Sequence, residues 1–310
     1  MIKTLMLATV VAGCNSSSST TTSADAPASL RPGVDDSSQV YQGTPNADES
    51  AFWTAVRDAD DAGRATAVTQ LMADVTSDPT NGYSEFLVGA SDFMPPNTVL
   101  AAVANGTAPP QFRLSTAATP YLKSGLTNLT DPFYLGFDGA LLAELDFGAG
   151  DPTDAMPLFT TATMNNHAAT GFITVLNDLQ MQNTAGALAD MYTLLEYCNG
   201  GPLDHSGGDA GSYVAKANAG MLVHRECYSG FYAPHGSAGE MLILADLQAL
   251  NGNAQAATAY YTAVQSVSDY STWALKPLVE RRLAGTQPAV LGLVGVIAST
   301  CATCHTNTLQ

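Results

Sequence analysis

Residues 239–264 read GEMLILADLQALNGNAQAATAYYTAV, and this stretch decides the fold class. Its first half carries an apolar stripe at helical spacing, made of Leu242, Leu244, Ala245, Leu247 and Leu250. The sequence Asn-Gly-Asn at residues 251–253 stops this helix, because glycine readily adopts the left-handed conformation found at helix ends. A second helix is predicted from Ala254 to Val264. The stretch therefore predicts a helical hairpin.

Two further segments have a similar shape. Helices are predicted over Phe52–Ala62 and Arg64–Val75, with Gly63 between them. Another is predicted over Gly136–Phe147, followed by Gly-Ala-Gly-Asp at residues 148–151 and by a second amphipathic stretch. Apolar spacings of three and four dominate, and alternating stretches are few. The fold class is therefore predicted to be all-α.

The helical domain is predicted to span residues 47–310. Proline pairs and glycine mark a loop-rich connection near residues 95–120, and a glycine-rich run marks another at residues 200–211. Both are predicted to be loops within one domain rather than boundaries between domains.

The hairpin at residues 239–264 resembles a tetratricopeptide repeat. Small and aromatic residues fall at the offsets that such a repeat uses for packing, namely Leu244, Ala245, Gly252, Ala257, Tyr260 and Tyr261. The match is partial, because Ala263 is one position early for the last small residue and no strict 34-residue period connects the segments. The resemblance implies an irregular tetratricopeptide-like array of helical hairpins. The alternative is a general all-helical bundle.

The chain is strongly acidic. Its 310 residues include 11 Lys and Arg against 28 Asp and Glu, which gives a formal net charge of −17. Binding to nucleic acid needs cations that neutralise phosphates, so that class of function is excluded. The charge instead favours encounter with basic partners. No stretch approaches the roughly 18 consecutive apolar residues of a membrane-spanning helix, since the most apolar one, residues 289–298, contains two glycines.

The N-terminus has the organisation of a secretory signal. Lys3 supplies the positive charge, Leu5–Val11 forms the apolar region, and the small residues Ala12 and Gly13 precede Cys14. These features predict that the chain is exported.

The sequence Val-Ala-Gly-Cys at residues 11–14 resembles the lipobox of bacterial lipoproteins. The resemblance implies that residues 1–13 are a signal peptide and that Cys14 becomes the lipidated first residue, so that acyl chains hold the protein on a membrane. Asn15, where the family's inner-membrane retention signal has Asp, favours the outer membrane. Residues 14–46, which begin rich in Ser and Thr, are predicted to be a flexible tether. The alternative is an ordinary secretion signal with a chance cysteine.

The sequence CATCH at residues 301–305 has the C-x-x-C-H pattern of covalent c-type haem attachment. Cys301 and Cys304 are three residues apart, so on one helical turn both thiols reach the two vinyl groups at one edge of a porphyrin. His305 is then placed as the proximal ligand of the iron. Haem of this type is attached after export, and the predicted signal meets that condition.

A helix is predicted to carry this motif. Thr286 is a suitable N-cap and Pro288 suits the first turn. The apolar stripe that leads to the motif consists of Leu291, Val294, Ile297 and Ala298. This arrangement resembles class II cytochromes c, the cytochrome c-prime type, whose last helix carries C-x-x-C-H close to the C-terminus. The resemblance covers residues 286–305 and implies one covalent haem c.

The chain departs from the class II pattern in two ways. The Tyr/Phe-Arg pair that often follows the motif is absent, and the chain is more than twice a class II length. The sixth iron ligand is therefore unassigned. Candidates that would give a six-coordinate iron suited to electron transfer are His167, His235, Met156 and Met164. An open sixth position would instead suit small gases.

Cys301 and Cys304 have an alternative interpretation as a disulfide or redox pair, with His305 coincidental. A thioredoxin-type C-x-x-C opens a helix, where the helix dipole stabilises the thiolate. This pair is predicted to close a helix, which favours the haem interpretation.

Two cysteines, Cys198 and Cys227, stand outside both motifs. In an oxidising compartment they most simply form a disulfide, and closing a loop of about 30 residues would stabilise the fold by roughly 3 kcal/mol. One alternative is a tetrahedral zinc site that combines both cysteines with His205 and His224. Another is that both thiols stay unpaired.

Histidines and aromatic residues gather in the same part of the chain and would form a wall against the haem. They are His205, His224, His235, Tyr213, Tyr228, Phe231 and Tyr232. Each histidine is also a candidate distal ligand, and the alternative is that each is a solvated loop residue.

The sequence therefore predicts an exported, lipid-anchored protein with one haem c that transfers electrons at the periplasmic or outer-surface face of a bacterial membrane. Its expected partners are redox proteins, with basic ones favoured by the charge. An electron carrier is expected rather than an enzyme, since no Ser/His/Asp order, phosphate-binding glycine loop or H-E-x-x-H occurs. The alternatives are a haem-free helical-repeat scaffold of an envelope complex and a gas-binding, high-spin haem protein.

Overall fold

The computed structural model describes residues 45–57, 60–94, 96–107, 116–149, 151–224, 227, 235–267, 270–273 and 275–288. Within these residues the regular structure is entirely helical and contains no strand. The predicted all-α class is therefore confirmed. The predicted signal peptide, almost all of the predicted tether and residues 289–310 lie outside the described residues.

The helices follow one another along the chain with mostly short connections. They are α1 (Ala47–Arg57), α2 (Asp61–Ser77), α3 (Gly82–Ser91), α4 (Asn97–Ala104), α5 (Thr119–Asn128), α6 (Pro132–Ala149), α7 (Pro152–Asn165), α8 (His167–Gln180), α9 (Thr184–Asn199), α10 (Ala210–Asn218), α11 (His235–Leu250), α12 (Ala254–Val264) and α13 (Lys276–Leu283). Among these described helices, none has both the length and the apolar character needed to cross a bilayer.

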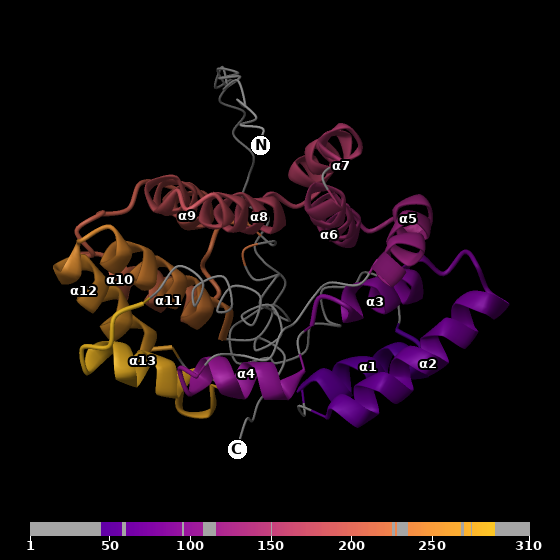
Figure 1. The fold of residues 1–310 in the computed structure, drawn as a ribbon, viewed down its shortest axis with the longest axis horizontal. Coiled ribbons are helices and arrows are strands. Elements are labelled where there is room, and N and C mark those ends of the chain that lie inside the picture. Colours follow the sequence, from indigo (N-terminus) through magenta and orange to yellow (C-terminus); the bar gives the residue numbers. More distant parts are fainter. Residues whose placement is uncertain are drawn as a thin grey trace, which may run out of the picture.

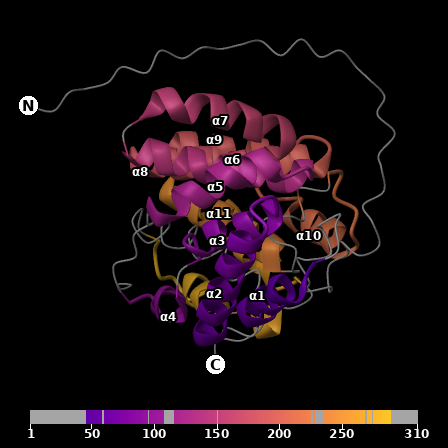
Figure 2. The same cartoon turned by 90° about the vertical axis from the view of Figure 1, so that its right-hand side faces the viewer.

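Neighbouring helices pack as hairpins, as the repeat-like spacing predicted. α1 packs on α2, α6 on α7, α8 on α9 and α11 on α12, while α3 packs on α5. In Figure 1 these pairs form an arc that runs from α1–α3 through α5–α9 to α10–α13. α4 contacts α13, so the two ends of the arc meet. Figure 2 shows the arc from the side, with α7 at its outer edge above α6, α8 and α9.

Side-chain caps fix where several helices begin. In each case an Asn or Asp before the helix accepts a hydrogen bond from the backbone N–H three residues later, which satisfies one unpaired donor of the first turn. These capping residues are Asp60, Asn81, Asp151 and Asn183, before α2, α3, α7 and α9. At the other end of α9, Gly200 adopts a left-handed conformation with a φ of 75° and closes the helix.

Small residues set the distance between packed helices. An ideal Cβ at Gly136 of α6 would lie 2.6 Å from the backbone nitrogen of Asn166, directly before α8. At Gly139, one turn further along α6, an ideal Cβ would lie 3.5 Å from Ala162 of α7. Only glycine permits the first of these approaches, so the helical backbones come closer together than larger residues would allow.

One large hydrophobic core runs through the arc, from Phe52 in α1 to Val279 in α13. The stripe predicted in residues 239–264 belongs to it, and Leu242, Leu244 and Leu247 are fully buried. α11 is in fact buried at every position from Ala238 to Gln248, around its whole circumference. It is a central helix rather than an amphipathic one, because α9, α10 and α12 all pack against it.

Each of the two predicted loops contains helical residues in the structure. The predicted loop near residues 95–120 contains α4, an apolar helix that packs on α13. Its sequence lies between two proline pairs, and the contact with α13 gives this apolar helix a surface to cover. The other predicted loop, residues 200–211, is non-helical as far as Asp209, and α10 begins at Ala210.

Candidate functional site

The residues of the two sequence motifs lie outside the described residues. These are Cys14 of the lipobox-like sequence and Cys301, Cys304 and His305 of the C-x-x-C-H motif. The helix expected to carry the C-terminal motif likewise falls almost entirely beyond the last described residue, 288. The haem interpretation therefore stays a prediction, and the described site consists of residues that precede the motif in the chain.

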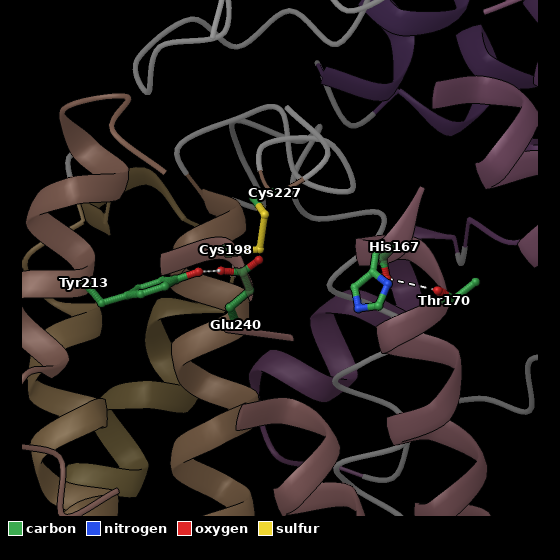
Figure 3. Close-up of a disulfide and its surroundings, with 6 residues drawn as sticks. All are labelled: His167, Thr170, Cys198, Tyr213, Cys227 and Glu240. Carbon is green, nitrogen blue, oxygen red and sulfur yellow. Dashed lines mark hydrogen bonds between the residues drawn. A yellow bond between two sulfur atoms is a disulfide. The ribbon is translucent and has the colours of Figure 1, made fainter. Parts of the chain in front are cut away.

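Cys198 and Cys227 form a disulfide in the structure (Figure 3). Cys198 lies at the end of α9, the S–S distance is 2.08 Å and the two Cα atoms are 5.5 Å apart. Both residues are buried. The Val223 N–H donates to the Cys198 carbonyl at 2.9 Å, so the backbone also holds the returning chain against α9. This is the pairing that the sequence favoured.

The alternative zinc site is not formed. The sulfur atoms of Cys198 and Cys227 are bonded to each other, so neither is a thiolate available to a metal. The other two expected ligands, His205 and His224, stack on different tyrosines. No group of three or more His, Cys, Asp or Glu side chains suited to a metal occurs in the part of the chain that the structure describes.

His205 secures the loop before α10. Its Nε2 lies 3.0 Å from the Glu196 carboxylate, and its exposed ring stacks on Tyr192 with 3.6 Å between centroids. Its carbonyl oxygen accepts hydrogen bonds from the Tyr192 hydroxyl at 3.2 Å and from Gln248 Nε2 at 3.1 Å. These contacts give His205 a structural role that ties the loop to α9 and α11.

His167, Tyr197 and His224 form what we call the ring cluster. The His224 ring is stacked on Tyr197, with centroids 3.9 Å apart and planes within 7°. The His167 ring lies 4.4 Å from the same tyrosine at an angle of 43°. The start of α8, the end of α9 and the segment after α10 each supply one residue. Because Tyr197 precedes Cys198, the ring cluster adjoins the disulfide.

A buried acid lies close to the disulfide (Figure 3). Glu240 of α11 accepts a hydrogen bond of 2.9 Å from the Tyr213 hydroxyl of α10. Burial raises the pKa of Glu240 to about 8, and the hydrogen bond from Tyr213 lowers it only in part. The carboxyl is therefore neutral near pH 7, which is how an acid without a cation is tolerated in a core.

Asp138 of α6 is a second buried acid, and the sequence analysis did not single it out. Within the described residues neither of its carboxyl oxygens has a hydrogen-bond partner. Burial and the nearby Glu85 raise the pKa of Asp138 well above its ordinary value. Glu85 in turn accepts hydrogen bonds from Ser124 and, at 2.8 Å, from Asn128. The pair lies where α3, α5 and α6 pack together.

The candidates for a sixth iron ligand occupy different environments. Met156 and Met164 are on α7 and are 52% and 75% exposed. His167 belongs to the ring cluster. His235 is the first residue of α11, and its side chain is outside the described part of the structure.

The last described helix is fixed to the body at two points. Arg282 of α13 donates from Nε and Nη2 to the two carboxylate oxygens of Asp246 on α11, at 2.9 and 3.2 Å. Its neighbour Arg281 donates to the carbonyl of Ala104 at the end of α4. These contacts hold α13 in a defined position against α11 and α4.

Sequence reasoning missed Glu240, Asp246 and Asp138, although all three carry a usable signal. Glu240 and Asp246 stand inside the apolar run that forms α11, where an acid must be buried and therefore neutral or paired. Asp138 stands in a similar run of α6, since its neighbours within residues 133–143 are apolar or aromatic residues and glycine.

Comparison of this chain with models of protein families, with curated proteins and with solved structures found no match.

Proposed function

We propose that this chain is an exported, lipid-anchored c-type haem protein that carries one haem and transfers electrons in the cell envelope. The observation that supports the proposal is a C-x-x-C-H sequence at residues 301–305 in the same chain as a predicted export signal, residues 1–13, that is directly followed by Cys14. Two thiols and an adjacent imidazole are the donor set that covalent haem c requires, so the residues present fit the group. When bound, the haem supplies a one-electron couple, and Cys301, Cys304 and His305 hold it.

The disulfide supports the proposal in two ways, because it agrees with export and because it accounts for the two cysteines that lie outside the motifs. Disulfides persist in oxidising compartments, which agrees with export. The Cys198–Cys227 bond uses two of the five cysteines, and the other three each stand in a motif whose chemistry modifies or ligates cysteine. These are Cys14, Cys301 and Cys304.

The described residues also suit a carrier that meets other proteins. The buried Arg282–Asp246 pair holds α13, the last described helix, to α11. The net charge of −17 would attract a basic redox partner and speed encounter at low ionic strength. The lipid on Cys14 would keep this encounter at the membrane surface, with the outer membrane favoured by Asn15.

A haem-free scaffold is the second candidate, and the arc of helical hairpins favours it, since such arrays commonly serve as binding surfaces. A gas-binding haem protein is the third. Detection of covalently bound haem would distinguish the electron-transfer protein from the haem-free scaffold. The spin state of the iron separates the first from the third, because an open sixth site gives a high-spin spectrum.

The test is expression of the full chain, with its own signal, in a bacterium that has a working c-type cytochrome maturation system. We expect a haem stain on the mature chain that survives denaturation and is lost in Cys301→Ala/Cys304→Ala. The matched control is Cys198→Ala/Cys227→Ala, which also removes two cysteines but should keep the stain. A mature wild-type chain without stain would favour the scaffold.

A further inference from the structure

Methionine occupies most of the exposed large apolar positions in the described part of the chain. Six such side chains are exposed there, and five of them are methionines. They are Met72 (43%), Met156 (52%), Met164 (75%), Met181 (66%) and Met221 (65%), which we call the outer methionines. The sixth is Val223. Among the side chains that the structure describes, no Leu, Ile, Phe or Trp is exposed to this degree.

The other easily oxidised side chains of the described residues are inside. Met94, Met191 and Met241 are 8%, 0% and 0% exposed and belong to the main core. Both tryptophans, Trp53 and Trp273, are also buried. Cys198 and Cys227 are already oxidised to a disulfide. Thioethers are therefore the main reducing groups that the described surface offers to solvent.

We propose that the outer methionines are a sacrificial oxidation site for small two-electron oxidants of the hypohalous acid class. The thioether sulfur displaces hydroxide from the chlorine of hypochlorous acid to form a chlorosulfonium. Water then adds to sulfur as chloride and two protons leave, and one of these protons neutralises the hydroxide displaced in the first step. The sulfur loses two electrons, which the chlorine gains, and the product is methionine sulfoxide.

Their positions allow this chemistry without loss of the fold. Met72 lies on α2, Met156 and Met164 lie on α7, Met181 lies in the turn after α8, and Met221 lies directly after the turn that follows α10. A sulfoxide at any of these sites places a new polar oxygen where the side chain already meets water. A sulfoxide at a core methionine would instead bury an unsatisfied polar group.

The inference stands independently of haem, since it rests on exposure alone. To exclude haem-catalysed oxidation, the experiment uses the mature wild-type chain and the Cys301→Ala/Cys304→Ala chain in parallel. Hypochlorous acid is added in steps up to about five equivalents per chain, one for each outer methionine, and sulfoxides are mapped by peptide mass spectrometry.

We expect both chains to collect sulfoxide at the outer methionines, with less than about a tenth as much at Met191 and Met241. Circular dichroism and the melting temperature should not change at this dose. Equal oxidation of outer and core methionines, or unfolding that accompanies the outer sulfoxides, would overturn the proposal.

Protection of the core is tested with a variant in which all five outer methionines are leucine, a replacement of similar volume that solvent-exposed sites tolerate. The control carries Met191→Leu and Met241→Leu and keeps the outer set. At the same dose, oxidation of Trp53 and Trp273 should rise several-fold in the first variant and not in the second. Equal tryptophan oxidation in the wild type and in the first variant would show that the outer methionines protect nothing.

Discussion

The Tyr213 hydroxyl donates a 2.9 Å hydrogen bond to the Glu240 carboxyl inside the core, close to the Cys198–Cys227 disulfide. A buried acid in contact with a neutral hydroxyl keeps its proton, since ionisation would leave a charge without a counter-ion. Burial accordingly raises the pKa of Glu240 to about 8. In the unfolded chain the same carboxyl titrates near its ordinary value of 4.5.

Stability should therefore fall as pH rises between these two pKa values. In that window the folded state keeps the Glu240 proton and the unfolded state has lost it, so each rise in pH favours unfolding. Glu240→Gln is neutral at every pH and its carbonyl still accepts from Tyr213. Across this window, the wild type should lose roughly 3–5 kcal/mol more than this variant in urea unfolding.

The control for this titration is Glu280→Gln, which changes an exposed carboxylate on α13. This variant should keep the wild-type pH dependence. Identical pH dependence in Glu240→Gln and the wild type would contradict the assignment of a buried, protonated Glu240.

Removal of the disulfide should weaken the whole α9–α11 region. The bond joins two cysteines that are 29 positions apart in the sequence, so Cys198→Ala/Cys227→Ala should lower the free energy of unfolding by about 2–5 kcal/mol. Chemical denaturation with and without a thiol reductant measures this. The reductant should destabilise the wild type and leave the variant unchanged, and an equal response in both would argue against a structural disulfide.

Loss of the buried Arg282–Asp246 ion pair should destabilise the fold far more than loss of the exposed ion pair on the same helix. The Arg282 side chain is 7% exposed and its partner Asp246 is 0% exposed, so Arg282→Met leaves a buried carboxylate without its cation. We expect a loss of about 3–5 kcal/mol. Glu280→Gln breaks the exposed pair with Lys276 and should cost less than about 1 kcal/mol. Equal costs would mean that the buried pair does not hold α13.

Two glycine substitutions test the close helix packing. Gly136→Ala places a methyl group 2.6 Å from the Asn166 backbone nitrogen and should destabilise the fold by roughly 1–3 kcal/mol. Gly211→Ala, within α10, meets nothing within 4 Å and should stabilise it by about 0.5–1 kcal/mol through higher helix propensity. Thermal unfolding of both variants measures the difference. Stabilisation by both would show that α6 can move away from α8.

The helical class and the hairpin at residues 239–264 were predictable because their signals are local. Apolar spacing reports helix period directly, and the Asn-Gly-Asn turn between α11 and α12 falls where the structure has it. The Cys198–Cys227 pairing followed from elimination, since the other three cysteines stand in motifs.

Other features depend on contacts between distant parts of the chain. α13 has a polar sequence, and its anchor is Asp246, which lies 36 residues before Arg282. α4 similarly packs on α13 from the opposite end of the domain. The burial of α11 from Ala238 to Gln248 on all sides arises from three other helices at once, so the period of its own sequence cannot reveal it.

The intact mass of the mature wild-type chain, purified from cells with an active c-type cytochrome maturation system, tests the central claim most directly. The account predicts a lipidated chain beginning at Cys14 that carries the added mass of one haem, and the loss of that added mass in Cys301→Ala/Cys304→Ala. A mature wild-type chain of haem-free mass, with Cys301 and Cys304 joined to each other, would contradict it.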